Sequence, residues 1–281
     1  MFLYLDAGYY INRSNGGTGL IFCDKSTEDS QGETVDPYLK CENKSPKIKD
    51  KYEVFINKES GFPVSSGSSA TLDAKIIVCS SEKCSVPEKS GSKYKYEGKE
   101  LDVNHYFINH ENEKVDSLIQ CKTSIGGTCS LVDANSDPAL NVGFYINGIE
   151  DLSLIKCSET KEKDDQGQEV KSTICETVGN VVKYGYYYSH DESKYIYCNN
   201  ENCSEQDAEQ TAVGKSFINS DGTSDKFIIS CASGTCSEVE AGDYYLDSSL
   251  EEGWNLLKCG ESDCTKVEGI NRGVYISDNG K

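Results

Sequence analysis

The sequence contains little of what builds a thick hydrophobic core, a membrane span or a cluster of imidazole ligands. Among 281 residues it has one Trp, one Met and three His, and hydrophobic residues make up 36% of the chain. The longest uninterrupted apolar runs are a few residues long, whereas a membrane helix needs about 18 or more. No stretch of about eleven residues places its apolar residues at helical spacing. A membrane helix, a helical bundle and a single large core are therefore not expected.

Basic residues are also scarce. The 28 Lys and Arg stand against 47 Asp and Glu, which gives a formal net charge of −19. Proteins that bind nucleic acids or anionic membranes need a basic face, so we expect no nucleic-acid partner and no membrane contact. The acidic residues are dispersed over polar stretches such as Glu159–Asp165, which is typical of a solvated surface.

Cysteine, by contrast, is abundant, and its spacing is regular. The fourteen cysteines form seven consecutive pairs, of which four are five residues apart, one is eight apart and two are eighteen apart. The pairs are Cys23/Cys41, Cys79/Cys84, Cys121/Cys129, Cys157/Cys175, Cys198/Cys203, Cys231/Cys236 and Cys259/Cys264. In the two widest pairs we expect the extra residues to be insertions into the tip of a loop.

Each pair follows the same short aromatic pattern. Gly8–Asn12 leads to Cys23, and Gly143–Asn147 leads to Cys157. The pattern is Gly, any residue, Tyr or Phe, an apolar residue or Tyr, and then Asn, Ser or Asp. We call the Tyr or Phe the anchor and the residue before it the pre-anchor residue. The anchors are Tyr10, Phe55, Phe107, Tyr145, Tyr187, Phe217, Tyr245 and Tyr275.

These anchors predict one tandem array. Its approximate repeats, numbered in chain order, are 8–53, 54–104, 105–142, 143–184, 185–213, 214–241, 242–272 and 273–281. The last three anchor spacings of 30, 28 and 30 residues indicate a basic repeat near thirty residues, so the longer repeats carry insertions. The eighth repeat ends before any cysteine, and we expect the chain to be a piece of a longer array.

Three short runs rich in Tyr, Ile and Val occur in each repeat, separated by Gly, Asn, Asp and Ser, and such runs are typical of β-strands. Three strands of this size cannot bury both faces alone, so neighbouring repeats must pack on one another. We predict an all-β fold, an elongated solenoid-like stack of short three-stranded, disulfide-stapled repeats.

The even cysteine count and the fixed places of the pairs favour disulfides within each repeat, although pairing between adjacent repeats stays open. Zinc is the alternative. A tetrahedral structural site needs four ligands, seven pairs do not divide into sets of four, and only His105, His110 and His190 could contribute imidazole. Disulfides also predict secretion, with any leader sequence removed, since Met1 runs directly into Phe2–Leu5.

No set of residues has the spacing of an active site. In so acidic a chain, adjacent carboxylates such as Asp164 and Asp165 are expected by chance and do not indicate a catalytic pair. Asn219–Gly222 is more simply a turn than a calcium loop. We therefore predict no catalytic residue, no cofactor and no metal. Three sequences, beginning at Asn12, Asn43 and Asn202, match the acceptor pattern for N-glycosylation.

The pre-anchor position is the candidate for contact with a partner. Strand alternation places it on the face opposite the anchor, and it varies from aromatic residues to Ser, whereas the anchor is expected to form a buried ladder. Tyrosine makes a good interface residue because its ring is half apolar and half polar. Packing beneath a loop is the competing interpretation. The candidate contact residues are Tyr9, Tyr106, Phe144, Tyr186 and Tyr244.

The repeat also resembles those of scaffoldins from anaerobic gut fungi. The resemblance rests on Gly143–Cys175, Gly185–Cys203, Gly214–Cys236 and Gly242–Cys264, with looser copies upstream. It implies a non-catalytic scaffold that binds dockerin-bearing glycoside hydrolases and other plant-cell-wall-degrading enzymes. The two eighteen-residue cysteine loops, and the absence of the Gly before Phe55, depart from the pattern and put binding by those repeats in doubt. Choline-binding and glucan-binding repeats are also rich in Tyr, but their ligand-site Trp is represented only by Trp254.

We therefore expect a secreted scaffold, associated with the cell surface as part of a longer chain, that assembles a fungal cellulosome. One alternative is an adhesin or carbohydrate-binding repeat protein that uses exposed tyrosines. Another is a purely structural wall protein.

Overall fold

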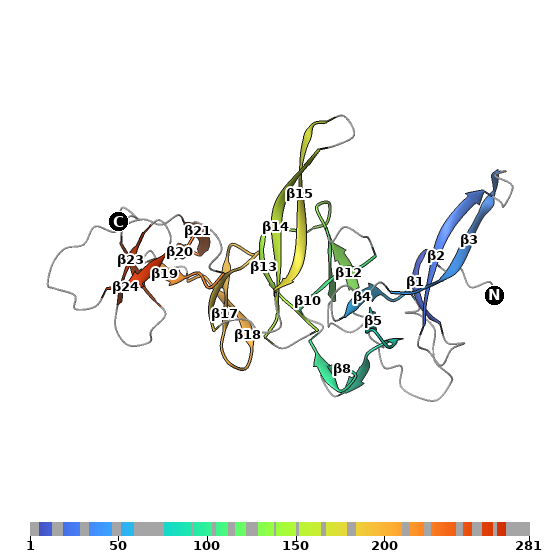
Figure 1. The fold of residues 1–281 in the computed structure, drawn as a ribbon, viewed down its shortest axis with the longest axis horizontal. Coiled ribbons are helices and arrows are strands. Elements are labelled where there is room, and N and C mark those ends of the chain that lie inside the picture. The colour runs from blue at the N-terminus through green and yellow to red at the C-terminus, as the bar shows by residue number, and fades with distance from the viewer. Residues whose placement is uncertain are drawn as a thin grey trace. The chain divides into compact units, whose positions relative to one another are not determined.

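The computed structural model describes a discontinuous set of ranges, each shown as coloured ribbon in Figure 1. They are residues 6–12, 19–28, 34–46, 52–58, 76–90, 93–102, 105–111, 116–121, 129–137, 139–149, 152–163, 167–178, 184–209, 214–221, 226–239, 244–248, 255–260 and 263–267. Within these ranges the regular structure is β-strand, and no helix capable of crossing a membrane is found there. The predicted eighth repeat with its anchor Tyr275, and Trp254, lie outside the described residues.

Each of the first seven repeats contains a three-stranded antiparallel meander that carries its anchor and its cysteine pair. The meanders of repeats one to five are β1 (Gly8–Asn12), β2 (Gly19–Glu28) and β3 (Thr34–Lys44); β4 (Glu53–Ile56), β5 (Ile76–Cys79) and β6 (Cys84–Ser85); β10 (Tyr106–Ile108), β11 (Leu118–Cys121) and β12 (Cys129–Val132); β13 (Gly143–Ile146), β14 (Leu154–Lys163) and β15 (Glu169–Val178); and β16 (Gly185–Tyr188), β17 (Lys194–Cys198) and β18 (Cys203–Asp207).

The sixth and seventh repeats supply β19 (Lys215–Ile218), β20 (Ile228–Ala232) and β21 (Thr235–Val239), then β22 (Tyr244–Asp247), β23 (Asn255–Cys259) and β24 (Cys264–Lys266). These two meanders join into one six-stranded sheet, because β19 and β22 pair in parallel at Ser216 and Asp247. The prediction of an all-β chain of small, disulfide-bonded, three-stranded sheets is confirmed.

The first two strands of every meander pair in the same register. Each anchor stands opposite an Ile or Leu of the middle strand, as Phe107 does with Ile119 and Tyr245 with Leu257. The seven anchors in these meanders are at most 6% exposed. Their predicted burial is therefore confirmed.

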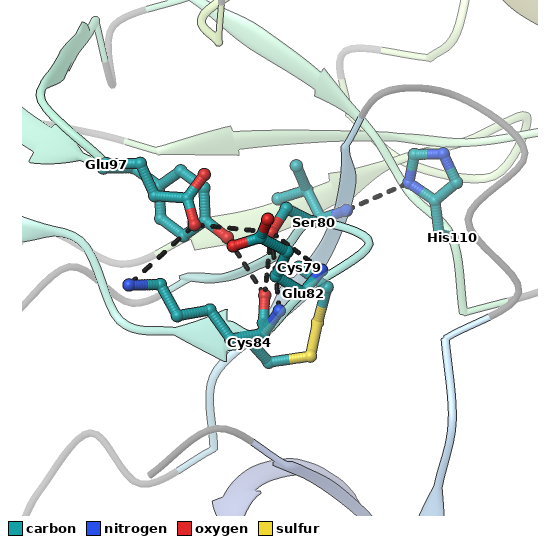
Figure 2. Close-up of a disulfide and its surroundings, with 9 residues drawn as sticks. Cys79, Ser80, Glu82, Cys84, Glu97 and His110 are labelled. Carbon is teal, nitrogen blue, oxygen red and sulfur yellow. Dashed lines mark hydrogen bonds and ion pairs between the residues drawn. A yellow bond between two sulfur atoms is a disulfide. The ribbon is translucent and has the colours of Figure 1, made fainter. Parts of the chain in front are cut away.

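The cysteines of one repeat stand directly opposite each other on its second and third strands. Beside the Cys79–Cys84 disulfide the Ser80 N–H donates to the Lys83 carbonyl at 2.9 Å (Figure 2), so the cysteines occupy a non-hydrogen-bonded position, where Cα atoms come closest. Six disulfides within repeats have Cα–Cα distances of 3.9–4.0 Å: Cys23–Cys41, Cys79–Cys84, Cys121–Cys129, Cys198–Cys203, Cys231–Cys236 and Cys259–Cys264.

Cys157 and Cys175 are disulfide-bonded as well, so all fourteen cysteines are oxidised. A zinc–thiolate site is excluded, because none of the sulfur atoms is a thiolate. Pairing between adjacent repeats is excluded for the six pairs above. The disulfides also indicate an oxidising, extracellular environment.

The chain divides into two compact units. The first comprises residues 1–140, 147–150 and 158–177, and the second comprises 141–146, 151–157 and 178–281. In both units the core lies between consecutive sheets. One face of a sheet carries the anchor and the disulfide, and the other face carries the pre-anchor residue and the residue after the anchor.

Two clusters form the core of the first unit. The pre-anchor face of repeat one packs on the disulfide face of repeat two, in a cluster of Tyr9, Ile11, Leu20, Phe55, Ile77, Cys79 and Cys84. The pre-anchor face of repeat two packs on repeat three, in a cluster that includes Val54, Ile56, Ile76, Val78, Phe107, Ile119 and Cys121. The disulfides are thus part of the core.

The second unit repeats this arrangement three times. Repeats four and five meet through Phe144, Ile146, Leu154, Tyr187, Ile196, Cys198 and Cys203. Repeats five and six meet through Phe217, Ile229, Cys231 and Cys236, with Tyr186, Tyr188 and Tyr195 packed against them. Repeats six and seven meet through Ile228, Tyr245, Leu257 and Cys259.

An additional meander lies within repeat two, formed by β7 (Glu88–Ser90), β8 (Lys93–Tyr96) and β9 (Lys99–Leu101). Its buried Tyr96 and Leu101 join the core between repeats two and three. The Tyr96 hydroxyl donates to the Lys83 carbonyl at 3.0 Å, so this meander supports the turn that carries the Cys79–Cys84 disulfide (Figure 2). The insertion expected in this long repeat is therefore a folded sheet.

The insertions in the two cysteine pairs that are eighteen residues apart are two-stranded ribbons and not loops, which corrects the expectation from sequence (Figure 1). Beyond the Cys23–Cys41 disulfide, β2 and β3 stay paired from Asp24 and Lys40 to Glu28 and Thr34. Along β14 and β15 the Thr160 and Ser172 hydroxyls lie 2.8 Å apart. The described side chains of both ribbons beyond the disulfides are exposed or half-buried, and most of them are polar.

Candidate partner-binding surface

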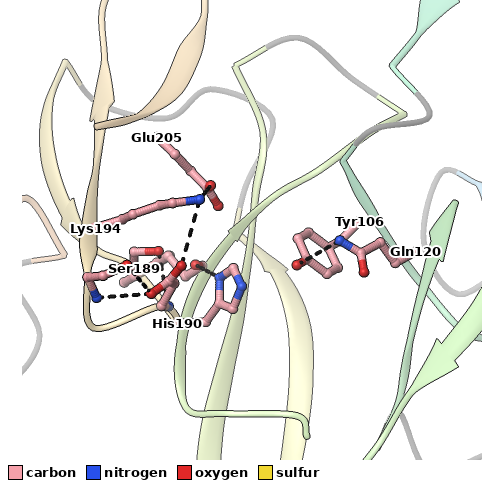
Figure 3. A network of polar contacts seen from close by, with 9 residues as sticks. Tyr106, Gln120, Ser189, His190, Lys194 and Glu205 are labelled. Carbon is pink, nitrogen blue, oxygen red and sulfur yellow. Dashed lines mark hydrogen bonds and ion pairs between the residues drawn. The ribbon is translucent and has the colours of Figure 1, made fainter. Parts of the chain in front are cut away.

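The five predicted contact residues lie on the first strand of their meanders, with different exposure. Tyr9 and Phe144 are buried, at 8% and 2% exposed, and Tyr106, Tyr186 and Tyr244 are half-buried. In Figure 3 the Tyr106 hydroxyl accepts a hydrogen bond from Gln120 Nε2 at 3.0 Å. Contact of these residues with a partner stays a prediction, and the structure shows what they contact within the chain.

Pre-anchor rings pack on the anchor of the following repeat. The ring centroids of Tyr9 and Phe55 are 4.6 Å apart, and those of Tyr186 and Phe217 are 4.3 Å apart. Phe144 meets Tyr187 edge-on at 5.2 Å. At these junctions the aromatic ladder therefore alternates between pre-anchor and anchor, instead of running from anchor to anchor as expected.

The backbone of the pre-anchor residue forms a parallel bridge to the next repeat. The bridges are Tyr9–Asn57, Val54–Asn109 and Tyr106–Asn147 in the first unit, and Phe144–Ser189, Tyr186–Asn219 and Ser216–Asp247 in the second. In each, the residue after the bridged Asn, Ser or Asp donates its N–H to the pre-anchor carbonyl, at 2.8 to 3.3 Å. The first strand lies at the edge of its meander, so this bond satisfies a carbonyl that the meander itself leaves unpaired.

At three junctions a side chain completes this contact. The pre-anchor N–H groups of Tyr186 and Ser216 donate to the hydroxyls of Ser220 and Ser248, at 3.0 and 3.2 Å. The N–H of Val54 donates to His110 Nδ1 at 3.1 Å (Figure 2). One residue of the next repeat thus binds the pre-anchor residue twice. Its backbone N–H donates to the pre-anchor carbonyl, and its side chain accepts from the pre-anchor N–H.

The Gly of the repeat permits this close approach. Gly143 has a φ of +126°, and a Cβ on it would lie 2.9 Å from the backbone nitrogen of His190. Gly8 and Gly185 also have positive φ and face the residue after the bridged position, Lys58 and Ser220 respectively. The side-chain-free backbone therefore makes room for the next repeat.

A second recurring contact joins the first strand to the third. The polar residue that ends the first-strand pattern is buried in all seven repeats, from Asn12 at 8% to Ser189 at 0% exposed. In repeats one, six and seven its side chain meets the residue two positions after the second cysteine. Asn12 Nδ2 donates to Asn43 Oδ1, and Asn219 Nδ2 donates to Glu238 Oε1, each at 2.7 Å. In repeat seven the same places hold an ion pair, Asp247 and Lys266, at 3.4 Å.

Among the described residues, the most accessible aromatic group lies at the start of repeat five and includes Tyr184, the last residue of repeat four. Tyr184 is 63% exposed, and its hydroxyl accepts a 2.7 Å hydrogen bond from Tyr197. The ring centroids of Tyr186 and Tyr197 are 5.0 Å apart, and Tyr195 packs beside Tyr186 at 6.0 Å. Burial, followed by the neighbouring phenols, raises the pKa of Tyr186 to about 12. We call Tyr184, Tyr186, Tyr195 and Tyr197 the tyrosine cluster; it combines apolar rings with uncharged hydroxyl donors and acceptors.

A network of polar contacts surrounds His190, which follows the bridged Ser189 (Figure 3). The imidazole stacks on Tyr145 with a centroid distance of 3.8 Å, and its Nδ1 lies 3.3 Å from the Phe144 carbonyl. Burial lowers the pKa of His190, although Glu205 and Asp191 act in the opposite direction. Lys194 contacts Glu205 at 2.8 Å and Asp191 at 3.7 Å.

A shallow hollow of about 250 Å³ lies where the β2–β3 ribbon leaves its sheet, lined by Phe22, Asp24, Lys25, Ser26, Lys40 and Glu42. Its charges are mixed, and its one ring, that of Phe22, is also packed against Tyr9 at 4.8 Å. The ribbons expose isolated apolar side chains, Tyr38 on β3 and Val170 and Ile174 on β15. None of these forms a patch comparable with the tyrosine cluster.

No protein-family model, curated protein or solved structure matches the chain.

Sequence reasoning missed three of the residue sets described here. The tyrosine cluster includes Tyr184, Tyr195 and Tyr197, which lie outside the anchor pattern; the density of tyrosines between Tyr184 and Tyr197 was the available signal. Ser220, Ser248 and His110 follow the polar end of the pattern in three repeats, but their role depends on a junction that a single repeat does not contain. The contact between first and third strands likewise becomes visible only once the register is known.

Proposed function

We propose that the protein is a non-catalytic extracellular scaffold whose repeats bind dockerin modules of plant-cell-wall-degrading enzymes. The observation that carries the proposal is the recurrence of one junction, an edge-strand bridge with an aromatic pre-anchor ring on the next anchor. A chain built from such junctions presents a series of similar sheets, which suits the binding of several copies of one module. The resemblance to gut-fungal scaffoldins supplies the identity of the partner.

In this proposal the repeats form one solenoid-like stack within a longer, cell-surface chain. Tethering several enzymes along one chain raises their effective concentration at the substrate without new chemistry. The net charge of −19 keeps such a chain soluble and favours partners with a neutral or basic face.

The proposed contact surface centres on the tyrosine cluster of repeat five, which contains Tyr186 from the predicted set. Tyr106 and Tyr244 are half-buried and hold the corresponding places in repeats three and seven. Tyr9 and Phe144 are covered by the following repeat, so we assign them to the junction, where they stabilise the packing of neighbouring sheets. Rigid tyrosines that are partly buried lose little side-chain entropy when a partner covers them.

The second candidate is a carbohydrate-binding repeat protein or adhesin. The specific observation in its favour is the hydroxyl chain from Tyr197 to Tyr184 beside exposed ring surface, since a sugar offers both polar hydroxyls and an apolar face. The two candidates predict different ligands for the same residues.

Isothermal titration of the oxidised protein with a fungal dockerin module, with and without chelator, tests the first candidate. We expect saturable binding that survives chelation, with a stoichiometry that counts the binding-competent repeats. The double variant Tyr184→Ala/Tyr197→Ala should lower that stoichiometry by one site. Tyr38→Ala, which removes an exposed tyrosine from the β2–β3 ribbon, serves as the matched control and should change nothing.

Affinity electrophoresis through gels containing soluble plant polysaccharides tests the second candidate. Retardation that the tyrosine double variant abolishes, together with no heat on addition of dockerin, would replace the scaffold by the adhesin. No response to either ligand would favour a purely structural wall protein.

A further inference from the structure

Two acceptor sequences for N-glycosylation meet in the first repeat. The sequences are Asn12-Arg13-Ser14 and Asn43-Lys44-Ser45; Asn12 is the last residue of β1, and Asn43 lies near the end of β3. We infer that Asn43 carries an N-linked glycan in the secreted protein and that Asn12 does not. The inference requires entry into an oxidising secretory compartment, which the disulfides indicate, and is independent of the partner proposed above.

Asn12 occupies a position that the fold keeps buried. It is 8% exposed, and the equivalent residues of the next six repeats are between 0% and 7% exposed. Its Nδ2, the atom that would carry a glycan, donates the 2.7 Å hydrogen bond to Asn43 Oδ1. A sugar on this nitrogen would have to fit inside the repeat, where Asn12 is buried, so a folded, secreted chain has to be unmodified here.

Asn43 has the opposite environment. It is exposed on β3, which is the edge strand of the order β1-β2-β3. Because Oδ1 and Nδ2 diverge from Cγ in a planar amide, the bond from Asn12 to Oδ1 directs Nδ2 of Asn43 away from the buried contact. Lys44 and Ser45, which complete the acceptor sequence, are exposed as well.

The modification is a transfer without oxidation or reduction. A membrane-bound oligosaccharyltransferase uses a lipid-pyrophosphate-linked oligosaccharide as donor. A bond forms between C1 of the first sugar and Nδ2, the bond between C1 and the pyrophosphate oxygen breaks, and Nδ2 loses one proton. A glycan at Asn43 would also stand beside the open edge of β3, where bulk hinders pairing with the strand of another chain.

The chain supplies matched variants for the test. Expressed with a cleavable secretion leader in a glycosylating eukaryotic host, the secreted protein is analysed by peptide mass spectrometry. Release with peptide N-glycosidase in ¹⁸O-water marks each formerly occupied Asn as labelled Asp. We expect the label at Asn43 and none at Asn12. Ser45→Ala should remove one glycan from the intact mass, Ser45→Thr should retain it, and Ser14→Ala should leave the number of glycans unchanged.

All three serine variants keep Asn12 and Asn43, so the hydrogen bond between these two residues remains possible. A difference in glycosylation therefore cannot be attributed to the loss of this contact. Label at Asn12, loss of a glycan in Ser14→Ala, or an unmodified Asn43 would each overturn the inference. Asn202 is exposed too, but disulfide-bonded Cys203 occupies the middle of its acceptor sequence, so the first repeat gives the cleaner comparison.

Discussion

At the scale of single residues, the end of the first strand shows how one buried site accepts different polar side chains. Asn12 and Asn219 donate to an oxygen on the third strand, whereas Asp247 faces the ammonium of Lys266 instead. The partner changes from acceptor to cation when the buried residue changes from amide to carboxylate. Such compensation is expected where an unmatched buried polar group costs free energy.

This compensation predicts an asymmetric pair of variants. Lys266→Met leaves the carboxylate of Asp247, 1% exposed, without its cation, and should lower the free energy of unfolding by about 1–2 kcal/mol. Asp247→Asn restores the amide found at this place in other repeats and should cost less than about 0.5 kcal/mol. Urea denaturation with the disulfides intact measures both. The double variant should recover most of the loss, and an additive result would contradict a direct interaction.

The half-buried imidazole of His190 predicts a dependence of stability on pH. Its pKa in the folded chain lies below the ordinary 6.5, so between the two values the unfolded chain binds more protons than the folded chain. The stabilisation is therefore fully present above pH 6.5 and is lost as the pH falls toward the folded pKa. Charged neighbours that face the ring are Glu205, Asp191 and Lys194.

Melting temperatures measured from about pH 7.5 down to about pH 5 should therefore fall less steeply for His190→Gln than for the wild type. His105→Gln removes an imidazole from the surface of repeat three and is the control. If the melting temperature of His190→Gln falls with decreasing pH as steeply as that of the wild type, groups other than His190 cause the loss of stability.

At the scale of the element, the junction needs space as well as hydrogen bonds. Gly143→Ala would place a methyl group 2.9 Å from the His190 backbone nitrogen, at a φ of +126° that an L-residue rarely adopts. We expect a loss of about 1–3 kcal/mol in the free energy of unfolding. Gly260→Ala is the control, because its nearest neighbour would lie at an ordinary 3.8 Å. Equal melting temperatures for the two variants would mean that the junction accommodates the added methyl group without loss of stability.

The strands of each repeat could be predicted from sequence because their signals are local. Tyr, Ile and Val alternate between turn residues, and burial of the anchor follows from its recurrence as an aromatic residue. The β7–β9 meander was not predicted, although Lys93-Tyr94-Lys95-Tyr96 alternates as a strand should, because it is not part of the sequence pattern that recurs between repeats. The junction could not be predicted at all, since Tyr9 and Asn57 are 48 residues apart and nothing in the local pattern marks a parallel bridge.

The ribbon on repeat four predicts that its insertion can be removed. Replacing residues 158–174 with Asn199–Asn202, the turn that closes the cysteine pair of repeat five, should leave Cys157 and Cys175 bonded. Exposed Val170 and Ile174 bury little apolar surface there, and a lone two-stranded ribbon has little stability of its own. We expect an unchanged disulfide map and a melting temperature within a few degrees of wild type. Loss of the Cys157/Cys175 bond would show that the ribbon helps to form it.

At the scale of the whole molecule, stability comes from many small interfaces instead of one large core. Each sheet contributes a few apolar side chains and a disulfide to the interface with the preceding repeat, as in the cluster of Phe217, Ile229, Cys231 and Cys236. Stability in such chains is close to a sum of repeats and nearest-neighbour interfaces. A disulfide here stabilises its own hairpin and also fills space between two sheets, so its accessibility depends on its neighbours.

This dual role predicts the order in which a reductant cleaves the disulfides of the native protein. A thiolate must reach a sulfur atom, so attack on a buried disulfide waits for local opening of the sheets around it. Cys41 is exposed, whereas Cys79 and Cys198 are fully buried against the preceding repeat. Timed reduction with dithiothreitol, alkylation and peptide mass spectrometry should find Cys23–Cys41 cleaved first and Cys79–Cys84 and Cys198–Cys203 cleaved last. In denaturant the order should disappear. Equal native rates would mean that the disulfides do not contribute to the interfaces between sheets, and the thin core would then have to be held by the aromatic contacts and edge-strand bridges alone.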